Sequence, residues 1–298
     1  MAPAKSMDTA TALNLNGRNV LVTGGSRGLG RAIVKELGAQ RANVLFCSQT
    51  EKQLLAASDE LRAFFPPPQR LIAQVSDISQ EKEVAQLFKR LTAEFDTLYA
   101  VVNNAGIQEP IGCFDQADWS AWRRTIEVNL LGTALVCRHA IPFLKDAGCG
   151  KIVNLSGGGA ATPRARFSAY AASKAAVVRL TEVLAEELRE FHIDVNAVAP
   201  AALNTRLLDE IVAAGADKAG AGSYAQAIQQ LAEGGYPIEQ AARLCVYLAS
   251  PASDGITGKL ISAQWDRWSD LQQHRELLQS SDIYTLRRIV PKDRGYDW

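Results

Sequence analysis

The chain has 298 residues, 47% hydrophobic and 21% charged, and its 32 basic side chains balance its 32 acidic ones. Such a composition predicts an ordinary globular protein with ample core, and the length permits one or two domains. The balanced charge gives no electrostatic reason to expect a nucleic acid or a membrane surface as partner. The apolar runs, such as 130–137, are far shorter than the roughly 20 residues of a membrane-spanning helix.

The first 16 residues mix charged and polar side chains with alanine and lack the apolar core of a secretory signal. We expect them to form a flexible leader on a cytoplasmic protein. The five cysteines are widely spaced and odd in number, which argues against a disulfide framework. Neither they nor the three histidines show paired metal-ligand spacing, so no metal site is predicted.

A short apolar strand at 19–23 runs directly into a glycine-rich turn at 24–30, and a helical pattern follows. Glycines let the backbone approach a ligand closely, and the free N–H groups at the start of a helix favour a pyrophosphate. A plain tight turn is the alternative. The flanking strand and helix favour a dinucleotide site.

The end of the second strand, 43–48, bears on the choice of cofactor. A carboxylate there would bind the adenosine ribose of NAD, but the chain has Ser48 and Gln49 instead. Arg27 in the glycine turn can pair with a phosphate through two N–H groups. The sequence therefore favours NADP(H) over NAD(H), with a solvent-facing arginine as the alternative for Arg27.

The alternation of strand and helix continues along the chain. Helices are predicted at 51–64, 80–95 and about 122–144, and further strands at 71–75, 98–103, 151–155, 193–198 and 259–262. Uniformly apolar strands between helices are typical of a parallel sheet that is covered on both faces. We expect an α/β fold, a single doubly wound Rossmann-type domain of about seven strands over 17–262. Ligands of such sheets bind beyond the carboxyl ends of the strands.

A predicted helix carries Tyr170 and Lys174 four positions apart, with apolar residues continuing at helical spacing over 177–188. Positions i and i+4 lie on one side of a helix. If that side faces a ligand, the lysine charge lowers the pKa of the phenol and makes it a possible acid and base. The spacing is common, and by itself it more often means an exposed lysine beside a half-buried tyrosine.

Taken in order, these residues resemble the short-chain dehydrogenase/reductase family, in its short-form branch, from about 19 to 262. Residues 23–30 match its Thr-Gly-x-x-x-Gly-x-Gly motif, 103–106 its Asn-Asn-Ala-Gly motif and 170–174 its Tyr-x-x-x-Lys motif. Asn129 and Ser156 stand in the places of the family's helix asparagine and strand-end serine. Because these motifs occur together and in the family's order, we interpret Tyr170 as a functional residue rather than as a half-buried tyrosine beside an exposed lysine.

The resemblance implies an NAD(P)-dependent oxidoreductase in which Tyr170 exchanges a proton with the substrate oxygen while a hydride moves to or from the nicotinamide. Lys174 would lower the pKa of the tyrosine and bind the nicotinamide ribose, Ser156 would hold the substrate oxygen, and Asn129 would keep a water behind the lysine. The implied cofactor-binding residues are Gly24, Ser26, Arg27, Gly28, Leu29, Gly30, Ser48, Asp77, Asn104, Ala105, Gly106, Tyr170, Lys174, Pro200, Leu203 and Thr205.

Two local departures from the family pattern concern the site. Ser156 stands fourteen residues before Tyr170, one more than is common, and three glycines follow it. A register shifted by one would put glycine in place of the serine, but an extra residue in the glycine loop is easier to accommodate, and we keep Ser156. Pro200 is followed by Ala201 instead of glycine, from which we expect a small effect.

The chain continues for 36 residues beyond 262, with aromatic side chains among arginines. We expect this extension, 263–298, to pack on its own domain or on a neighbouring subunit, or to shape the substrate pocket, and these roles are compatible. The stretch 205–236 stands where the family has a mobile lid over the substrate.

The sequence thus predicts an NADP(H)-dependent oxidoreductase that interconverts a carbonyl and a secondary alcohol on a small polar or cyclic substrate. The family implies a homodimer or homotetramer. Two alternatives are an NADP(H)-binding redox sensor without turnover and a sugar-nucleotide epimerase or dehydratase. The intact set of four site residues argues against the first, and the glycine spacing and missing larger substrate domain argue against the second.

Overall fold

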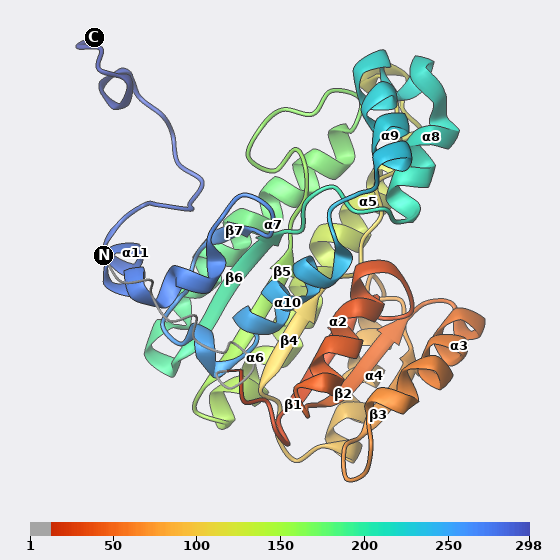
Figure 1. Cartoon of the computed structure of the whole chain (residues 1–298), viewed down its shortest axis with the longest axis vertical. Coiled ribbons are helices and arrows are strands. Elements are labelled where there is room, and N and C mark those ends of the chain that lie inside the picture. The colour runs from red at the N-terminus through yellow and green to blue at the C-terminus, as the bar shows by residue number, and fades with distance from the viewer. Residues whose placement is uncertain (1–12) are drawn as a thin grey trace.

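The computed structural model describes residues 13–298, and most of the expected leader, residues 1–12, lies outside the described residues. Seven parallel strands form one sheet in the order β3-β2-β1-β4-β5-β6-β7 (Figure 1). The strands are β1 (Asn19–Thr23), β2 (Asn43–Ser48), β3 (Leu71–Val75), β4 (Ala100–Asn103), β5 (Gly150–Leu155), β6 (Ile193–Ala199) and β7 (Leu260–Ser262). The strand order reverses between β1 and β4, which is where sheets of this kind bind ligands.

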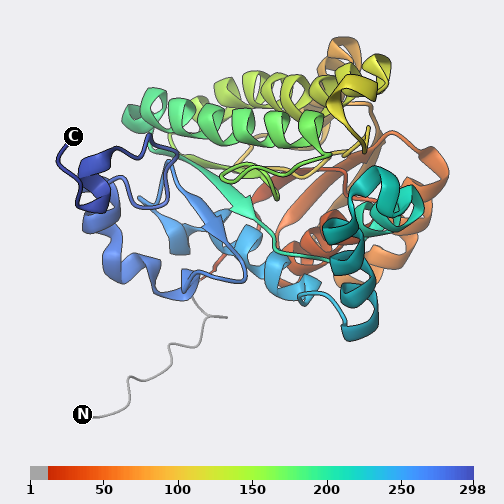
Figure 2. The same ribbon diagram turned by 90° about the horizontal axis from the view of Figure 1, so that it is seen from above.

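Helices cover both faces of the sheet (Figure 2). They are α2 (Gly28–Ala39), α3 (Glu51–Leu61), α4 (Glu81–Glu94), α5 (Trp119–Ile126), α6 (Thr133–Asp146), α7 (Ser168–Glu187), α8 (Arg206–Ala219), α9 (Ala221–Glu233), α10 (Ile238–Leu248) and α11 (Arg275–Ser280). Val20 and Val22 of β1 pack in one hydrophobic core with α2, α3 and α10, whereas Leu21 packs in a second core with α4, α6 and α7. This alternation of side chains, combined with burial of both faces, gives the doubly wound single domain that the sequence predicted.

The long helix expected at about 122–144 differs from the prediction. It begins earlier, at Trp119, where the Asp118 side chain accepts a hydrogen bond from Ser120 N and caps the helix. It also contains a π turn, Glu127–Gly132, between α5 and α6. Such turns occur frequently at functional sites, and this one carries Asn129. The other predicted boundaries lie within about two residues of those observed, apart from α3, which ends in a 3-10 turn over Arg62–Phe64.

The packed domain begins before the expected boundary at residue 17. Leu13 and Leu15 are buried in the same hydrophobic core as α2 and α10. The part of the expected leader that the structure describes is therefore anchored to the domain.

The first part of the C-terminal extension packs on the domain. Leu271 and Leu278 are buried in the core, and Trp268 lies against Tyr247 of α10 with ring centroids 5.6 Å apart. The backbone carbonyl of Tyr284 accepts a hydrogen bond from the N–H of Leu260 in β7. The residues from 287 onward are mostly exposed, and Figure 1 shows them running away from the body of the molecule.

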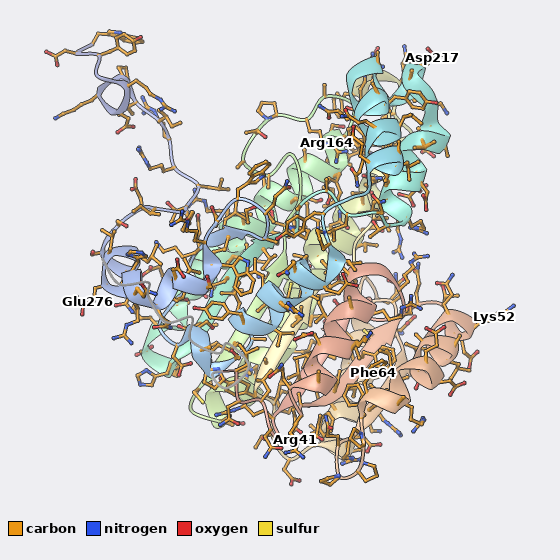
Figure 3. The ribbon with its side chains drawn as sticks, viewed as in Figure 1. Arg41, Lys52, Phe64, Arg164, Asp217 and Glu276 are labelled. Carbon is orange, nitrogen blue, oxygen red and sulfur yellow. The ribbon has the colours of Figure 1, made fainter. Side chains whose placement is uncertain are left out.

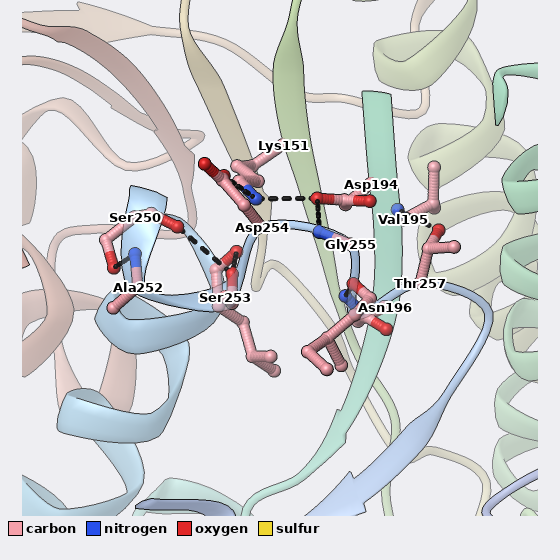
Figure 4. A network of polar contacts seen from close by, with 12 residues as sticks. Lys151, Asp194, Val195, Asn196, Ser250, Ala252, Ser253, Asp254, Gly255 and Thr257 are labelled. Atoms are coloured by element: carbon pink, nitrogen blue, oxygen red, sulfur yellow. Dashed lines mark hydrogen bonds and ion pairs between the residues drawn. The ribbon is translucent and has the colours of Figure 1, made fainter. Parts of the chain in front are cut away.

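A buried ion pair ties the amino ends of β5 and β6 together (Figure 4). The Lys151 ammonium group lies 2.6 Å from Asp194 Oδ2 and 2.6 Å from Asp254 Oδ1, and Asp194 also accepts a hydrogen bond from Gly255 N. Only 3% of the Lys151 side chain is exposed. The network stands at the opposite end of the strands from the turn of β1 and α2, so we assign it to the stability of the sheet.

Candidate active site

The glycine turn between β1 and α2 is packed too closely for side chains. A Cβ atom on Gly24 would lie 2.8 Å from Ala105 Cα, and one on Gly30 would lie 2.1 Å from the carbonyl oxygen of Gly24. Arg27, at the N-cap of α2, makes no side-chain cap hydrogen bond, so the first N–H groups of the helix receive no such cap. This arrangement suits the pyrophosphate of a dinucleotide, as the sequence predicted.

The loop after β4 supports this turn from the neighbouring strand. Thr23 Oγ1 accepts hydrogen bonds from the N–H groups of Asn104 and Ala105, both at 3.1 Å. The Asn104 side chain donates in return to the carbonyl oxygens of Thr23 and Gly24, at 3.1 and 3.0 Å. The asparagine therefore fixes the backbone at the start of the glycine turn.

One cavity of about 1420 Å³ lies beyond the carboxyl ends of the strands. All sixteen residues predicted to bind the cofactor line it, and so does Ser156. Asn129 lies behind its wall, in the π turn. Two residues that sequence reasoning missed, Arg124 and Arg164, also line the cavity, and so does Trp265 of the C-terminal extension, for which a role in shaping the substrate pocket was one expectation.

The end of β2 carries hydroxyl groups where a carboxylate would contact an adenosine ribose. Ser26 Oγ donates to Ser48 Oγ at 2.9 Å. Arg27 and Lys35 line the same part of the cavity, together with Arg31, which pairs with Glu60. Burial, and next the charge of Arg206, lower the pKa of Arg27. Arg27 and Lys35 have no ion-pair partner in the described part of the chain, so this end of the cavity carries unpaired positive charge.

Asp77, at the end of β3, is held by its surroundings. Its Oδ1 accepts hydrogen bonds from Ser79 N and Ser79 Oγ, at 3.0 and 2.8 Å, and its other oxygen pairs with Arg124. Burial works to raise the pKa of Asp77, but the Ser79 hydrogen bonds and the Arg124 charge outweigh it and hold the pKa below its ordinary value. Arg124 could not be found from the sequence, because an arginine on an amphipathic helix usually faces solvent.

Lys174 lines the cavity, and Asn129 lies behind its wall. Lys174 Nζ donates to the carbonyl oxygen of Leu155 at 2.7 Å, and burial lowers the pKa of Lys174 to about 8. Asn129 Nδ2 donates to the carbonyl oxygen of Ile107 and to Ser173 Oγ, while its Oδ1 accepts from Ile107 N. Asn129 thereby fixes the backbone that follows the Asn-Asn-Ala-Gly motif.

Tyr170 stands in the first turns of α7 and is only 7% exposed. Burial raises the pKa of its phenol, and the charge of Arg164 acts in the opposite sense. The sequence predicted the reverse net direction, with Lys174 as the lowering charge. The difference arises because burial dominates and because the Lys174 ammonium donates to a carbonyl, 5.8 Å from the centre of the tyrosine ring.

The residue next to the phenol is Gly157. A Cβ atom on Gly157 would lie 2.1 Å from Tyr170 Oη, so the hydroxyl occupies the space of a side chain at this position. Ser156 continues the β5 ladder through its N–H to Val198 O, and its buried Oγ has no hydrogen-bond partner among residues 13–298. The catalytic role expected of Ser156 stays a prediction.

Ala201 follows Pro200 beside the cavity, in the position where the resemblance implies glycine. Its φ is 74°, in the left-handed region, which costs a residue with a Cβ roughly 1–2 kcal/mol. Thr205 stands four residues further on, and its methyl carbon would lie 3.5 Å from a Cβ atom on Gly28. The chain thus keeps a glycine-like turn there without glycine.

Comparison with known proteins agrees with this geometry. The profile described as short chain dehydrogenase matches residues 18–215. The chain belongs to the short-chain dehydrogenase family. It is 35% identical over 245 residues to the cis-4-hydroxycyclohexanecarboxylate dehydrogenase of Sinomonas cyclohexanicum, covering 82% of this chain and 94% of the relative. It is 33% identical over 246 residues to the L-fucose dehydrogenase of Mus musculus, covering 82% and 86%.

Among solved structures, a short-chain type dehydrogenase/reductase from Mycobacterium ulcerans superposes with a TM-score of 0.75 at 30% identity, covering 84% of this chain and 89% of that one. Membership of this family makes the protein an NAD(P)-dependent oxidoreductase. The resemblance inferred from the motifs is confirmed.

Two further features, a metal-binding cluster and a membrane-spanning helix, are absent from the described part of the chain. No group of three or more His, Cys, Asp or Glu side chains there is arranged to hold a metal ion. Within residues 13–298, no helix combines the length and the apolar character that crossing a bilayer requires.

Proposed function

We propose that this short-chain dehydrogenase is an NADP(H)-dependent oxidoreductase that interconverts a carbonyl and a secondary alcohol on a small polar or cyclic substrate. The observation that carries the proposal is a single cavity in which the glycine turn, Tyr170 and Lys174 all face the same space. The names of the two relatives, which refer to a hydroxylated cyclohexane acid and a sugar, support the substrate class.

The dinucleotide, when bound, supplies or accepts the hydride. The free N–H groups of α2 hold its pyrophosphate. Lys174, in its charged form, binds the ribose and stabilises the phenolate of Tyr170, which would offset the effect of burial on the tyrosine. The Tyr170 hydroxyl passes a proton to or from the substrate oxygen. Ser156 lines the same cavity, and its role in the proposal is to hold the same oxygen once its buried hydroxyl turns toward the substrate.

Cofactor choice rests on the cationic end of the cavity. The expected consequence is that Arg27→Ala weakens the binding of NADPH far more than that of NADH, because only NADPH carries the 2′-phosphate. Dissociation constants from fluorescence titration measure this. Arg90→Ala, at an exposed arginine of α4 outside the cavity lining, serves as control and should change neither constant. Equal losses for both cofactors would show that Arg27 does not read the phosphate.

Turnover is tested with a panel of ketones and NADPH on wild type and Tyr170→Phe. The expected result is NADPH oxidation with small cyclic or polar ketones that the variant loses. A wild type that binds NADPH but is as inactive as Tyr170→Phe would favour a redox sensor. Turnover confined to steroids or long acyl thioesters would contradict the substrate class, and conversion of sugar nucleotides without net NADPH consumption would point to an epimerase or dehydratase.

The assembly and the lid are part of the proposal. We expect a homodimer or homotetramer formed through α6 and α7, whose neighbourhood exposes Leu131 and Val183 at 51% and 44%. Light scattering on Leu131→Glu tests this, because a variant that keeps the wild-type mass would exclude that surface.

The proposed lid is the α8–α9 hairpin, which closes over the substrate. Its Leu208 and Ile211 belong to the same hydrophobic cluster as Tyr170. The five free cysteines suit a cytoplasmic location.

A further inference from the structure

Arg164 is an arginine that the proposed chemistry does not use, and it lies beside the reacting end of the cavity. It stands in the loop between β5 and α7, near the α8–α9 hairpin (Figure 3). Its guanidinium carbon lies 3.7 Å from the ring centroid of the fully buried Phe167 and 6.0 Å from that of Tyr170. These contacts with aromatic rings restrict the motion of the guanidinium and hold it in one position.

The charge of Arg164 has no carboxylate partner within ion-pair distance in the described part of the chain. Three other arginines that line the cavity are paired, Arg31 with Glu60, Arg124 with Asp77 and Arg206 with Glu210, whereas Arg27 at the glycine turn has no such pair among the described residues. Arg164 is half-buried, and this burial lowers its pKa. A partly desolvated guanidinium without an anion is unfavourable, so an anionic ligand would gain more from it than from an exposed arginine.

The anion that fits is on the substrate rather than on the cofactor. The phosphates of the dinucleotide are expected at the glycine turn, where Arg27 lies, whereas Arg164 neighbours the phenol that meets the substrate oxygen. The guanidinium of Arg164 lies beside Gly158 at the wall of the cavity, where a Cβ atom on Gly158 would be 3.8 Å from Arg164 Nη1. A guanidinium matches the two oxygens of a carboxylate through parallel N–H bonds.

We propose that Arg164 binds a carboxylate of the substrate, so that the enzyme acts on cyclic hydroxy acids and their oxo acids. The inference rests on the proposed function, because it assigns the substrate class of the same site. Arg164 sets specificity, whereas Tyr170 performs the proton transfer.

The test compares 4-oxocyclohexanecarboxylate with its neutral carboxamide, which keeps the ring and the ketone. The variants are Arg164→Gln, Arg164→Lys and, as matched control, Arg166→Gln. Arg166 belongs to the same loop but donates to the carbonyl of Asp217 and does not line the cavity. Thermal unfolding of each variant shows that it is folded.

Wild type is expected to prefer the carboxylate in kcat/KM by roughly tenfold or more, as for a hydrogen bond to a charged group. Arg164→Gln should lose that preference through KM and keep its activity on the carboxamide, Arg164→Lys should retain part of it, and Arg166→Gln should keep all of it. Equal kcat/KM of wild type for the two ketones would overturn the inference and leave the proposed function intact. An equal loss on both ketones in Arg164→Gln would also overturn it, because the arginine would then act on Tyr170.

A binding measurement separates this inference from failure of the proposed function. If wild type reduces neither ketone, calorimetry with cyclohexanecarboxylate and NADP⁺ decides the matter. Binding by wild type that is lost in Arg164→Gln would support a carboxylate site in a protein with another activity. The same affinity in both, or no binding by wild type, would reject Arg164 as the carboxylate-binding residue.

Discussion

The contact between Gly157 and Tyr170 makes a sharp prediction for Gly157→Ala. The new Cβ would lie 2.1 Å from Tyr170 Oη, and real Cβ atoms essentially never approach other atoms closer than 3.0 Å. The phenol or the loop must therefore shift by about 1 Å, and a displacement of this size in a reacting group costs on the order of 100-fold in rate. That factor corresponds to about 2.7 kcal/mol in the activation free energy.

The neighbouring glycine supplies the matched control. A Cβ atom on Gly158 would have Arg164 as its nearest contact, at 3.8 Å, which is an ordinary van der Waals distance. Gly158→Ala should thus remove the same backbone freedom without moving the phenol. Neither glycine has a positive φ, so alanine can adopt both backbone conformations.

The measurement is kcat for the best ketone of the panel, together with NADPH affinity and thermal stability. We expect Gly157→Ala to lose most of kcat while NADPH still binds, and Gly158→Ala to remain within about threefold, since it leaves the phenol in place. If Gly157→Ala retains wild-type kcat, the phenol does not lie against this residue. Ser156 would then have to face Tyr170, as the sequence interpretation preferred.

Three further predictions concern stability. Ala201→Gly relieves a left-handed alanine and should raise the free energy of unfolding in urea by up to about 1 kcal/mol; a loss of stability would contradict the strain. Lys151→Met leaves the Asp194 carboxylate without its buried partner, so it should lower the free energy of unfolding by about 3 kcal/mol and leave kcat/KM unchanged. Asp254→Asn changes an exposed carboxylate and should lower the free energy of unfolding by less than about 1 kcal/mol. Equal losses would show that the network is not centred on the lysine. Lys174 has a pKa of about 8 when folded and 10.5 as the ordinary value, so the unfolded chain binds more protons between these pH values. The free energy of unfolding of wild type, relative to that of Lys174→Met, should therefore increase with pH over this window by about 3 kcal/mol in all. A difference between the two proteins that does not change with pH would contradict the lowered pKa of Lys174.

The sequence was most informative where a local pattern defines the structure. The strands were placed within two residues because each is a short, uniformly apolar run between helical segments. The glycine turn was placed because strand, glycines and helix occur consecutively, and Tyr170 and Lys174 because helical spacing puts them on one side. The order of the motifs then identified the family, which predicts the seven-stranded sheet better than periodicity alone.

Other features depend on tertiary packing and left weaker signals. The π turn around Asn129 keeps helical hydrophobic spacing on both sides, so nothing in the pattern separates it from a continuous helix. Leu13 and Leu15 share the alternate spacing of a packed segment, but two residues in a polar stretch are too few to outweigh its composition. The direction of the Tyr170 pKa shift could not be predicted, because burial decides it and burial is a property of the assembled core.

The register of the loop after β5 shows why a motif does not specify every atom of a site. Counting residues left Ser156 or Gly157 for the position of the family's strand-end serine, and which of the two lies against Tyr170 depends on where the backbone leaves the sheet. Ser156 still forms a ladder bond to β6, which makes it the last residue held by the strand and leaves Gly157 to turn toward α7. With no side chain at 157, the phenol fills that space, and the guanidinium carbon of Arg164 lies 6.0 Å from the centre of the Tyr170 ring. In the proposed function, proton transfer depends on Tyr170 and Lys174, which one helix aligns, and selection of the substrate depends on Arg164 in the loop that precedes this helix.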